Sequence, residues 1–158
     1  MPQLGLGSNL TGGVVLENDT TSFISTWGTA GATEANRTVT LPLISSGSIN
    51  FTISWGDGSS DTITAFNDAE RAHIYTAEGT YTVTMAGTIR GFSMDDDANN
   101  KTKLKTITQW GTFNISEEAA FHGCSALTIT ATDAPTVSSD SLQETFMGCT
   151  VLTSIGGD

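Results

Sequence analysis

A tight turn and a histidine sixteen residues after its aspartate carry side chains that could do chemistry: the turn WGDG contains Asp57, and His73 follows in HIY. A carboxylate and an imidazole could bind a cation or exchange protons. A calcium loop, however, shows acidic residues at close alternating spacing, and no nucleophile motif stands near the histidine. Asp-Gly between strand-like runs is a strong turn signal, because Gly58 tolerates positive φ and Asp57 can bond its own backbone. We therefore predict an architectural corner with no catalytic residue, in which His73 hydrogen-bonds the turn and a tyrosine anchors a strand. The predicted corner residues are Trp55, Asp57, Gly58, His73, Tyr75 and Tyr81.

The acidic cluster MDDDANN is a second candidate cation site. Asp95, Asp96 and Asp97 could bind calcium weakly, or they could lie in a solvated loop. A run of like charges is more often a solvated loop than a ligand site. We therefore expect this segment to connect two parts of the fold, and we expect neither a metal nor a cofactor.

Two cysteines occupy equivalent places in a repeated motif. FHGCSALT begins at Phe121 and FMGCTVLT at Phe146, a displacement of 25 residues that lies in the range of leucine-rich repeats. Adjacent turns would bring Cys124 and Cys149 within disulfide range, but a small buried ladder residue is the more common role, and cytoplasmic synthesis disfavours oxidation. Zinc would need two ligands beyond His122 and Cys124, and the sequence has no C-x-x-C pair. The predicted repeat core comprises Phe121, Cys124, Leu127, Phe146, Cys149 and Leu152.

The three tryptophans are candidates for sugar binding, because indole faces stack on sugar rings. Trp55 shares a strand face with Phe51 and Ile53, so we expect it in the core. Trp27 and Trp110 each precede a glycine and are expected to be only partly buried. These two residues are the candidate glycan contacts.

Segments with alternating apolar residues must supply the scaffold for these side chains. Thr and Ser occupy their other faces, which is the pattern of a half-buried antiparallel sheet, and two such sheets make an immunoglobulin-like β-sandwich. We predict an all-β fold, with this sandwich followed by a short leucine-rich-repeat-like β stack. The alternating residues are Val39, Leu41 and Leu43, then Phe51, Ile53 and Trp55, then Tyr81, Val83 and Met85. The predicted parts are an N-terminal arm or linker (1–21), the sandwich (22–92), an acidic connecting loop (93–102) and an incomplete repeat stack (103–158).

Charge and hydropathy exclude several classes of function. The chain of 158 residues holds 17 acidic and 6 basic residues, for a formal net charge of -11. This charge repels nucleic acid phosphates and anionic membranes, so we expect no nucleic acid partner. No apolar run approaches the roughly 18 residues that a membrane span needs. The start MPQLGLGSNLTGG lacks the basic and apolar regions of an export signal, and no spacing of carboxylates predicts a glycosidase pair.

Several motifs resemble known families of surface proteins. WGDGS followed by HIYTAEGTYTVTMAG resembles the PKD domain, the immunoglobulin-like sandwich of surface-exposed proteins. With KLKTITQWG, AFHGCSALTITATDAP and TFMGCTVLTSI, the arrangement from Phe23 to Asp158 is similar to the BspA-like leucine-rich-repeat surface proteins. That resemblance implies a non-enzymatic protein of attachment or protein contact. Such proteins usually carry many repeats and a secretion or anchoring signal, and this chain shows neither.

The N-terminal segment favours a bacteriophage context, because MPQLGLGSNLTGG is similar to the openings of phage tail and virion structural proteins. We therefore expect a structural or adhesive module on the virion surface, a head decoration, fibre or tail component anchored by its N-terminal arm. The expected partners are other virion proteins and a host-surface receptor or glycan, in a homo-oligomer or an assembled particle. The alternative is a secreted or cell-surface BspA-like adhesin or carbohydrate-binding module.

Overall fold

The computed structural model describes residues 19–95 and 97–156, which form a nearly all-β fold. The predicted arm therefore lies outside the described residues up to position 18. The strands are β1 (Phe23–Thr29), β2 (Thr38–Thr40), β3 (Asn50–Ser54), β4 (Ser60–Ile63), β5 (Ala72–Ile74), β6 (Gly79–Thr88), β7 (Leu104–Gln109), β8 (Asn114–Ile115), β9 (Thr128–Ile129) and β10 (Thr136–Val137). Two short helical segments, α1 (Glu34–Arg37) and the 3₁₀ turn η1 (Ala69–Arg71), lie in the connections.

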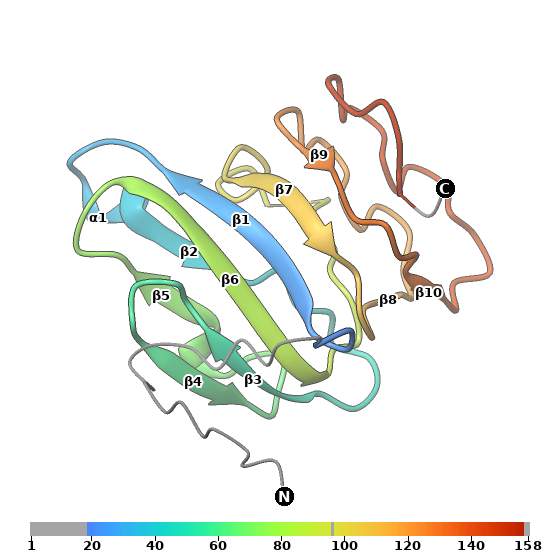
Figure 1. Cartoon of the computed structure of the whole chain (residues 1–158), viewed down its shortest axis with the longest axis horizontal. Coiled ribbons are helices and arrows are strands. Elements are labelled where there is room, and N and C mark those ends of the chain that lie inside the picture. Colours follow the sequence, from blue (N-terminus) through green and yellow to red (C-terminus); the bar gives the residue numbers. More distant parts are fainter. Residues whose placement is uncertain (1–18, 96, 157–158) are drawn as a thin grey trace, which may run out of the picture.

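One large sheet forms the main layer, with the strand order β4-β3-β6-β1-β7-β9 (Figure 1). β1 pairs antiparallel with β6, placing Trp27 opposite Tyr81, and β3 pairs antiparallel with β6, placing Ile53 opposite Met85. Every second residue of β1 is buried, because side chains alternate between the two faces of a strand. The alternation read from the sequence therefore sets which face of the sheet covers the core.

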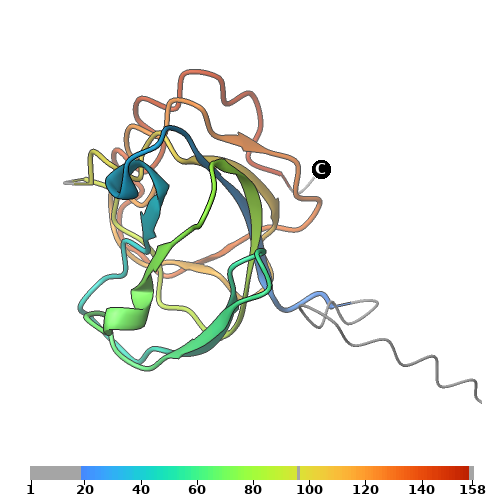
Figure 2. The same ribbon diagram turned by 90° about the vertical axis from the view of Figure 1, so that its left-hand side faces the viewer.

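A smaller layer closes the sandwich across the interior from the main sheet (Figure 2). It consists of the antiparallel pair β2 and β5, in which Val39 lies opposite His73, and a bridge joins Leu43 to Phe92 nearby. Val39, Leu41 and Phe92 are fully buried between the layers. The predicted all-β, immunoglobulin-like sandwich is thereby confirmed.

The C-terminal part stacks parallel segments onto the edge of the main sheet, in the orange-to-red region of Figure 1. β7 pairs with β9 and β8 pairs with β10, and both pairs join residues 22 positions apart, Thr106 with Thr128 and Asn114 with Thr136. Further along, the Phe121 amide donates to the Thr145 carbonyl at 2.9 Å. The segment therefore winds in turns, each of which hydrogen-bonds the next.

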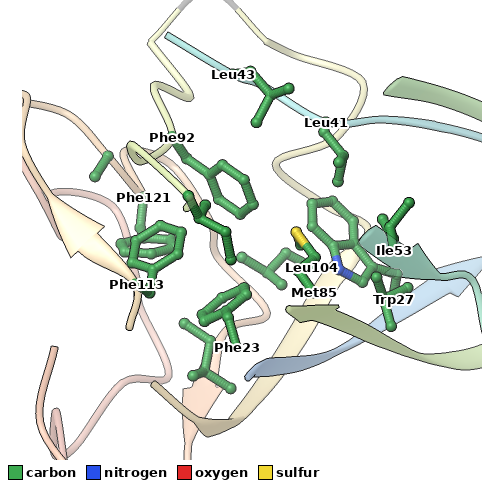
Figure 3. Packing of buried hydrophobic residues seen from close by; sticks show 14 of the residues in the cluster. Phe23, Trp27, Leu41, Leu43, Ile53, Met85, Phe92, Leu104, Phe113 and Phe121 are labelled. Carbon is green, nitrogen blue, oxygen red and sulfur yellow. The ribbon is translucent and has the colours of Figure 1, made fainter. Parts of the chain in front are cut away.

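A single hydrophobic core joins the sandwich to these turns (Figure 3). The Phe113 ring stacks on Phe23 of β1 with ring centroids 4.3 Å apart, and it lies 5.0 Å from Phe92. On the other side, Phe113 lies 5.9 Å from Trp110 and 5.8 Å from Phe121. The change of sequence pattern near residue 103 is thus not a boundary between two cores.

The connecting segment 93–102 is anchored to the sandwich. Met94 and Asn100 are buried. The Asn100 side chain donates to the Thr40 carbonyl at 2.7 Å and accepts from the Thr40 amide at 3.2 Å, so it pairs with β2 much as a strand would. The segment therefore packs on the fold through Met94 and Asn100, while Asp95 and Asn99 are exposed to solvent.

Candidate functional site

The WGDG turn connects β3 to β4 and closes a tight hairpin. Ser54 lies opposite Ser60, and the Trp55 amide donates to the Ser59 carbonyl at 3.1 Å. Gly56 and Gly58 both have positive φ, at 82° and 97°, a backbone conformation that glycine adopts at little cost. The turn is held by its backbone at both ends, which fixes the position of Asp57 between the glycines.

Asp57 joins the turn to β5 through its two carboxylate oxygens. Oδ1 accepts hydrogen bonds from the Ser59 amide at 3.0 Å and from the Ser59 hydroxyl at 2.5 Å. Oδ2 lies 2.8 Å from Nε2 of His73. The structure therefore brings together the aspartate and histidine that the sequence places sixteen residues apart.

Four aromatic rings extend from this contact in a row, which we call the corner row: Trp55, His73, Tyr75 and Tyr81. The Trp55 and His73 rings stack at 4.8 Å, His73 meets Tyr75 edge-on at 4.6 Å, and Tyr75 stacks on Tyr81 at 3.8 Å. Aromatic pairs in such offset-stacked and edge-on arrangements add stability beyond the area they bury. The row thus ties the β3 hairpin to β5 and β6.

The polar atoms of the corner row are used within the fold. The Tyr75 hydroxyl donates to the Trp55 carbonyl at 2.9 Å, and the Tyr81 hydroxyl donates to the Ala77 carbonyl at 2.9 Å. Burial, and then the nearby Asp57 and Tyr81, raise the pKa of the Tyr75 phenol, so it remains protonated and donates its hydrogen bond at every physiological pH. These hydrogen bonds to the backbone hold neighbouring strands together, which is the architectural role predicted for the corner.

The geometry does not fit a nucleophilic triad. Ser59 Oγ lies 3.5 Å from His73 Nε2, the same ring nitrogen that Asp57 approaches. A serine–histidine–aspartate relay needs the carboxylate and the hydroxyl on opposite ring nitrogens. In addition, the Ser59 hydroxyl donates its hydrogen bond to Asp57 and not to the histidine. The corner can hold a turn rigidly, but it cannot pass a proton from serine through histidine to aspartate.

The charge of Asp57 should stabilise the fold in a pH-dependent way. Desolvation opposes ionisation, but the Ser59 hydrogen bonds and then His73 outweigh it and lower the pKa of Asp57 from 3.8 to about 2. A depressed carboxyl pKa contributes stability that is present above the unfolded value and is lost as pH falls through the folded value. A shift of this size corresponds to roughly 2.4 kcal/mol, which solvent screening at this exposed turn reduces to about 1 kcal/mol.

We therefore expect Asp57→Asn to lower the free energy of unfolding by about 1 kcal/mol at pH 7. The loss should shrink between pH 4 and pH 2, because wild-type Asp57 then gains its proton. Urea unfolding at several pH values measures this. Glu70→Gln, an equal change of charge at an exposed residue, is the control and should change little. A loss that stays constant down to pH 2 would contradict the role of the charge.

The repeat residues come together in adjacent turns. The Phe121 and Phe146 rings stack at 5.5 Å with planes 8° apart. Phe121, Cys124 and Leu127 are fully buried, while Phe146, Cys149 and Leu152 pack against the core and are partly buried. Both cysteines are free thiols, and burial raises the pKa of Cys124 to about 12.

The expectation of partly exposed sugar-stacking tryptophans is wrong for Trp27 and Trp110. Both side chains are 0% exposed, so neither indole offers a face to a sugar ring. The Trp110 indole donates to the Ile155 carbonyl at 3.2 Å, and the Trp27 indole donates to Ser25 at 3.0 Å. A following glycine allows close packing here and does not indicate exposure.

The aspartates of the acidic cluster have separate partners. The Asp97 carboxylate accepts from the Asn100 amide at 3.0 Å, whereas Asp95 lies 3.0 Å from Nδ1 of His122. Asp96 lies outside the described residues. The calcium hypothesis thus receives no support from Asp95 and Asp97, which face different groups.

Sequence reasoning missed two aspartates that support the buried tryptophans. Asp61 of β4 accepts from the Trp55 indole at 2.8 Å. Asp133 accepts from the backbone amides of Trp110 at 3.1 Å and Gly111 at 2.7 Å. Asp61 follows the turn within the same hairpin, so the pairing of the two hairpin strands could have indicated its contact with Trp55. The contact of Asp133 depends on how the turns stack, which no sequence signal gives.

Comparison with known proteins identifies one family. Residues 24–103 match the family model of the PKD domain. No curated protein and no solved structure matches the chain. No helix among the described residues is long and apolar enough to cross a bilayer. The resemblance of the WGDGS and HIY motifs to the PKD domain is confirmed, and with half of its length matched the chain belongs to the PKD domain family, a non-catalytic immunoglobulin-like family found in extracellular or surface proteins.

Proposed function

We propose that this chain is a non-enzymatic structural or adhesive module of a bacteriophage virion, placed on the surface as a head decoration, a fibre or a tail component. Its N-terminal arm, residues 1–21, would attach it to the particle. The family supports a module of this general kind, because PKD domains are adhesive or structural units. The virion setting is supported by the resemblance of the N-terminal residues to phage structural proteins.

The observation that carries the proposal is the distribution of exposed apolar side chains along the chain. Of the seven large hydrophobic residues that are exposed among the described residues, five lie between positions 137 and 155. Exposed apolar side chains that gather in one region favour protein contact. The five are Val137, Leu142, Met147, Val151 and Ile155.

The polar corner supports the non-enzymatic part of the proposal. Asp57, Ser59 and His73 hydrogen-bond to one another, and the tyrosine hydroxyls donate to backbone carbonyls. Groups engaged in this way hold the fold, and they leave no free acid, base or nucleophile at the corner. The protein would act through display of a surface and not through turnover of a substrate.

Mass spectrometry of gradient-purified particles tests the virion setting. We expect peptides of this chain to co-purify with particles. Deletion of residues 1–18 should abolish incorporation, because it removes most of the arm. The deletion spares Asp19, whose carboxylate accepts from the amides of Thr21 and Ser22. Replacement of residues 1–18 by a glycine–serine segment of equal length is the control that separates sequence from length. Incorporation of either variant at the wild-type level would contradict the proposal that the arm attaches the protein to the particle.

The alternative is a secreted or cell-surface BspA-like adhesin or carbohydrate-binding module. An open cleft rich in hydroxyl and carboxylate groups favours it, because such groups hydrogen-bond sugars. A glycan array would discriminate between the two: binding that is lost in Ser116→Ala and Asp140→Asn would support the carbohydrate module. Recovery of a longer chain with an export signal from the cell surface would support the adhesin. The cleft is lined by Ser46, Ser93, Ser116, Glu117, Ser139 and Asp140, among others.

A further inference from the structure

Three potential metal ligands from distant parts of the sequence meet beside the stacked turns. Asp95, His122 and Glu144 each place one ligand atom within 4.8 Å of the others. His122 Nδ1 and Asp95 Oδ1 are 3.0 Å apart. A nitrogen and two carboxylate oxygens therefore converge on one place on the surface.

The backbone determines where the three ligands stand. The turn that carries His122 is hydrogen-bonded to the turn that carries Glu144, on both sides of the histidine: the Phe121 amide donates to Thr145 at 2.9 Å, and the Gly123 amide donates to Met147 at 2.7 Å. The Met94 amide donates to the Ala119 carbonyl at 3.2 Å, which holds the neighbouring Asp95 close to the first of these turns.

The two carboxylates converge with one ammonium group nearby, which pairs with neither of them. Within residues 19–95 and 97–156, no lysine or arginine nitrogen forms a salt bridge with Asp95 or Glu144. The Lys101 ammonium group donates instead to the backbone carbonyl of Asp95 at 2.6 Å. Two carboxylates close together repel each other unless a cation lies between them. The single charge of Lys101 offsets this repulsion only in part, so the arrangement still favours a bound cation.

We propose that Asp95, His122 and Glu144 form a binding site for a divalent transition metal ion, with Zn²⁺ as the expected ion. Zinc takes imidazole nitrogen and carboxylate oxygen at about 2.0–2.2 Å, so tetrahedral ligand atoms stand roughly 3.4 Å apart. The observed separations are 3.0 Å for His122 and Asp95 and no more than 4.8 Å for the other pairs, so side-chain rotation can bring the ligand atoms to that spacing. Calcium and magnesium prefer sets made of oxygen alone, whereas an imidazole suits zinc.

Water would fill the fourth position, because Asp95 and Glu144 are exposed. Neutral His122 would carry its proton on Nε2 and offer the Nδ1 lone pair to the metal, in place of the present contact with Asp95. The bound ion would connect the segment after the sandwich to two successive turns of the stack. Metal binding would therefore stabilise the stacked turns against local opening.

Isothermal titration calorimetry of the full chain with Zn²⁺ tests this site. We expect one ion per chain. Saturating Zn²⁺ at a hundredfold excess over Kd should raise Tm by about 5–10 °C. His122→Gln should weaken binding more than the roughly 10- to 100-fold that loss of an outer-shell partner costs. His73→Gln is the matched control, because His73 also pairs with an aspartate, at 2.8 Å, but belongs to no cluster of three ligands among the described residues. It should bind Zn²⁺ as the wild type does.

Two further variants locate the ion. Glu144 has a positive φ of 59°, which glycine adopts readily, so Glu144→Gly removes the carboxylate without straining the backbone. We expect this variant to fold and to lose Zn²⁺ affinity by a similar factor. Cys149→Ser should retain the affinity, because burial raises the pKa of the Cys149 thiol and so disfavours the thiolate that binds zinc. Full binding in Glu144→Gly, loss of binding in Cys149→Ser, or no binding by the wild type would each overturn the proposal.

Discussion

Phe113→Ala is expected to lower the free energy of unfolding by about 3–5 kcal/mol, the range for a large aromatic ring removed from a packed core. The Phe113 ring is fully buried. It lies between Phe23 and Phe92 on the sandwich side and Trp110 and Phe121 on the side of the stacked turns. Removal of this ring leaves a cavity where the two parts meet, so both should be destabilised together.

Hydrogen exchange during urea titration measures both parts at once. Amides of β3 and β6 report on the sandwich, and the Thr136 and Phe121 amides report on the stacked turns. We expect both sets to lose protection at one urea concentration in the wild type, and at one lower concentration in the variant. Phe66→Ala is the control: this ring is 41% exposed, and its loss should change stability by no more than about 0.5 kcal/mol. Earlier opening of the stacked turns alone would contradict a shared core.

The sandwich could be predicted from the sequence because its signals are local. The alternation of apolar residues in Phe51–Trp55 and Tyr81–Met85 assigns faces to β3 and β6, and side chains on a strand alternate with period two whatever the strand pairs with. The WGDG turn was also readable, since a turn depends on the conformations open to adjacent residues. The sequence also predicts that His73 hydrogen-bonds this turn, and in the structure its Nε2 lies 2.8 Å from Asp57 Oδ2.

The burial of Trp27 and Trp110 could not be predicted from such local signals. Their exposure depends on what covers them, and the cover comes from distant residues. Ile155 accepts the hydrogen bond of the Trp110 indole from 45 positions away, and the rings of Phe23, Phe113 and Phe121 pack around it. A glycine after a tryptophan carries no information about such long-range contacts.

The continuous core was likewise hidden from sequence patterns. Near residue 103 the sequence pattern changes from alternating apolar residues to a repeated motif, and this change predicts a division of the chain there. In the structure β7 adds to the edge of the sandwich sheet by pairing with β1, with Thr26 opposite Thr106. β7, the first strand of the stack, therefore covers the edge of β1 that the sandwich would otherwise expose. A covered edge is protected from pairing with other chains. Pairing partners of an edge strand are a property of three-dimensional topology, which the spacing of motifs does not encode.

The two glycines of WGDG are expected to differ sharply in what they tolerate, although both have positive φ. A Cβ atom at Gly56 would lie 2.4 Å from the Thr82 carbonyl oxygen and 2.9 Å from its amide nitrogen, whereas at Gly58 it would meet nothing within 4 Å. Gly58→Ala therefore carries only the cost of a left-handed alanine, roughly 1–2 kcal/mol. Gly56→Ala adds a clash with the backbone of β6, which cannot move without breaking strand pairs, so its total should reach about 3–4 kcal/mol.

Urea unfolding of the two single variants measures this difference in stability. The comparison is matched, because each variant adds one methyl group to the same turn. The near-ultraviolet circular dichroism of the corner row should change in Gly56→Ala, because a shift of the turn moves Trp55 against His73, whose rings now stack at 4.8 Å. It should stay close to wild type in Gly58→Ala. Equal losses of stability would mean that the turn does not pack tightly against β6. Backbone strain alone would then explain why both positions are glycine. The larger loss at Gly56 would assign the two glycines different roles: Gly58 lets the chain reverse direction, and Gly56 lets the reversed chain pack against the central strand of the sheet.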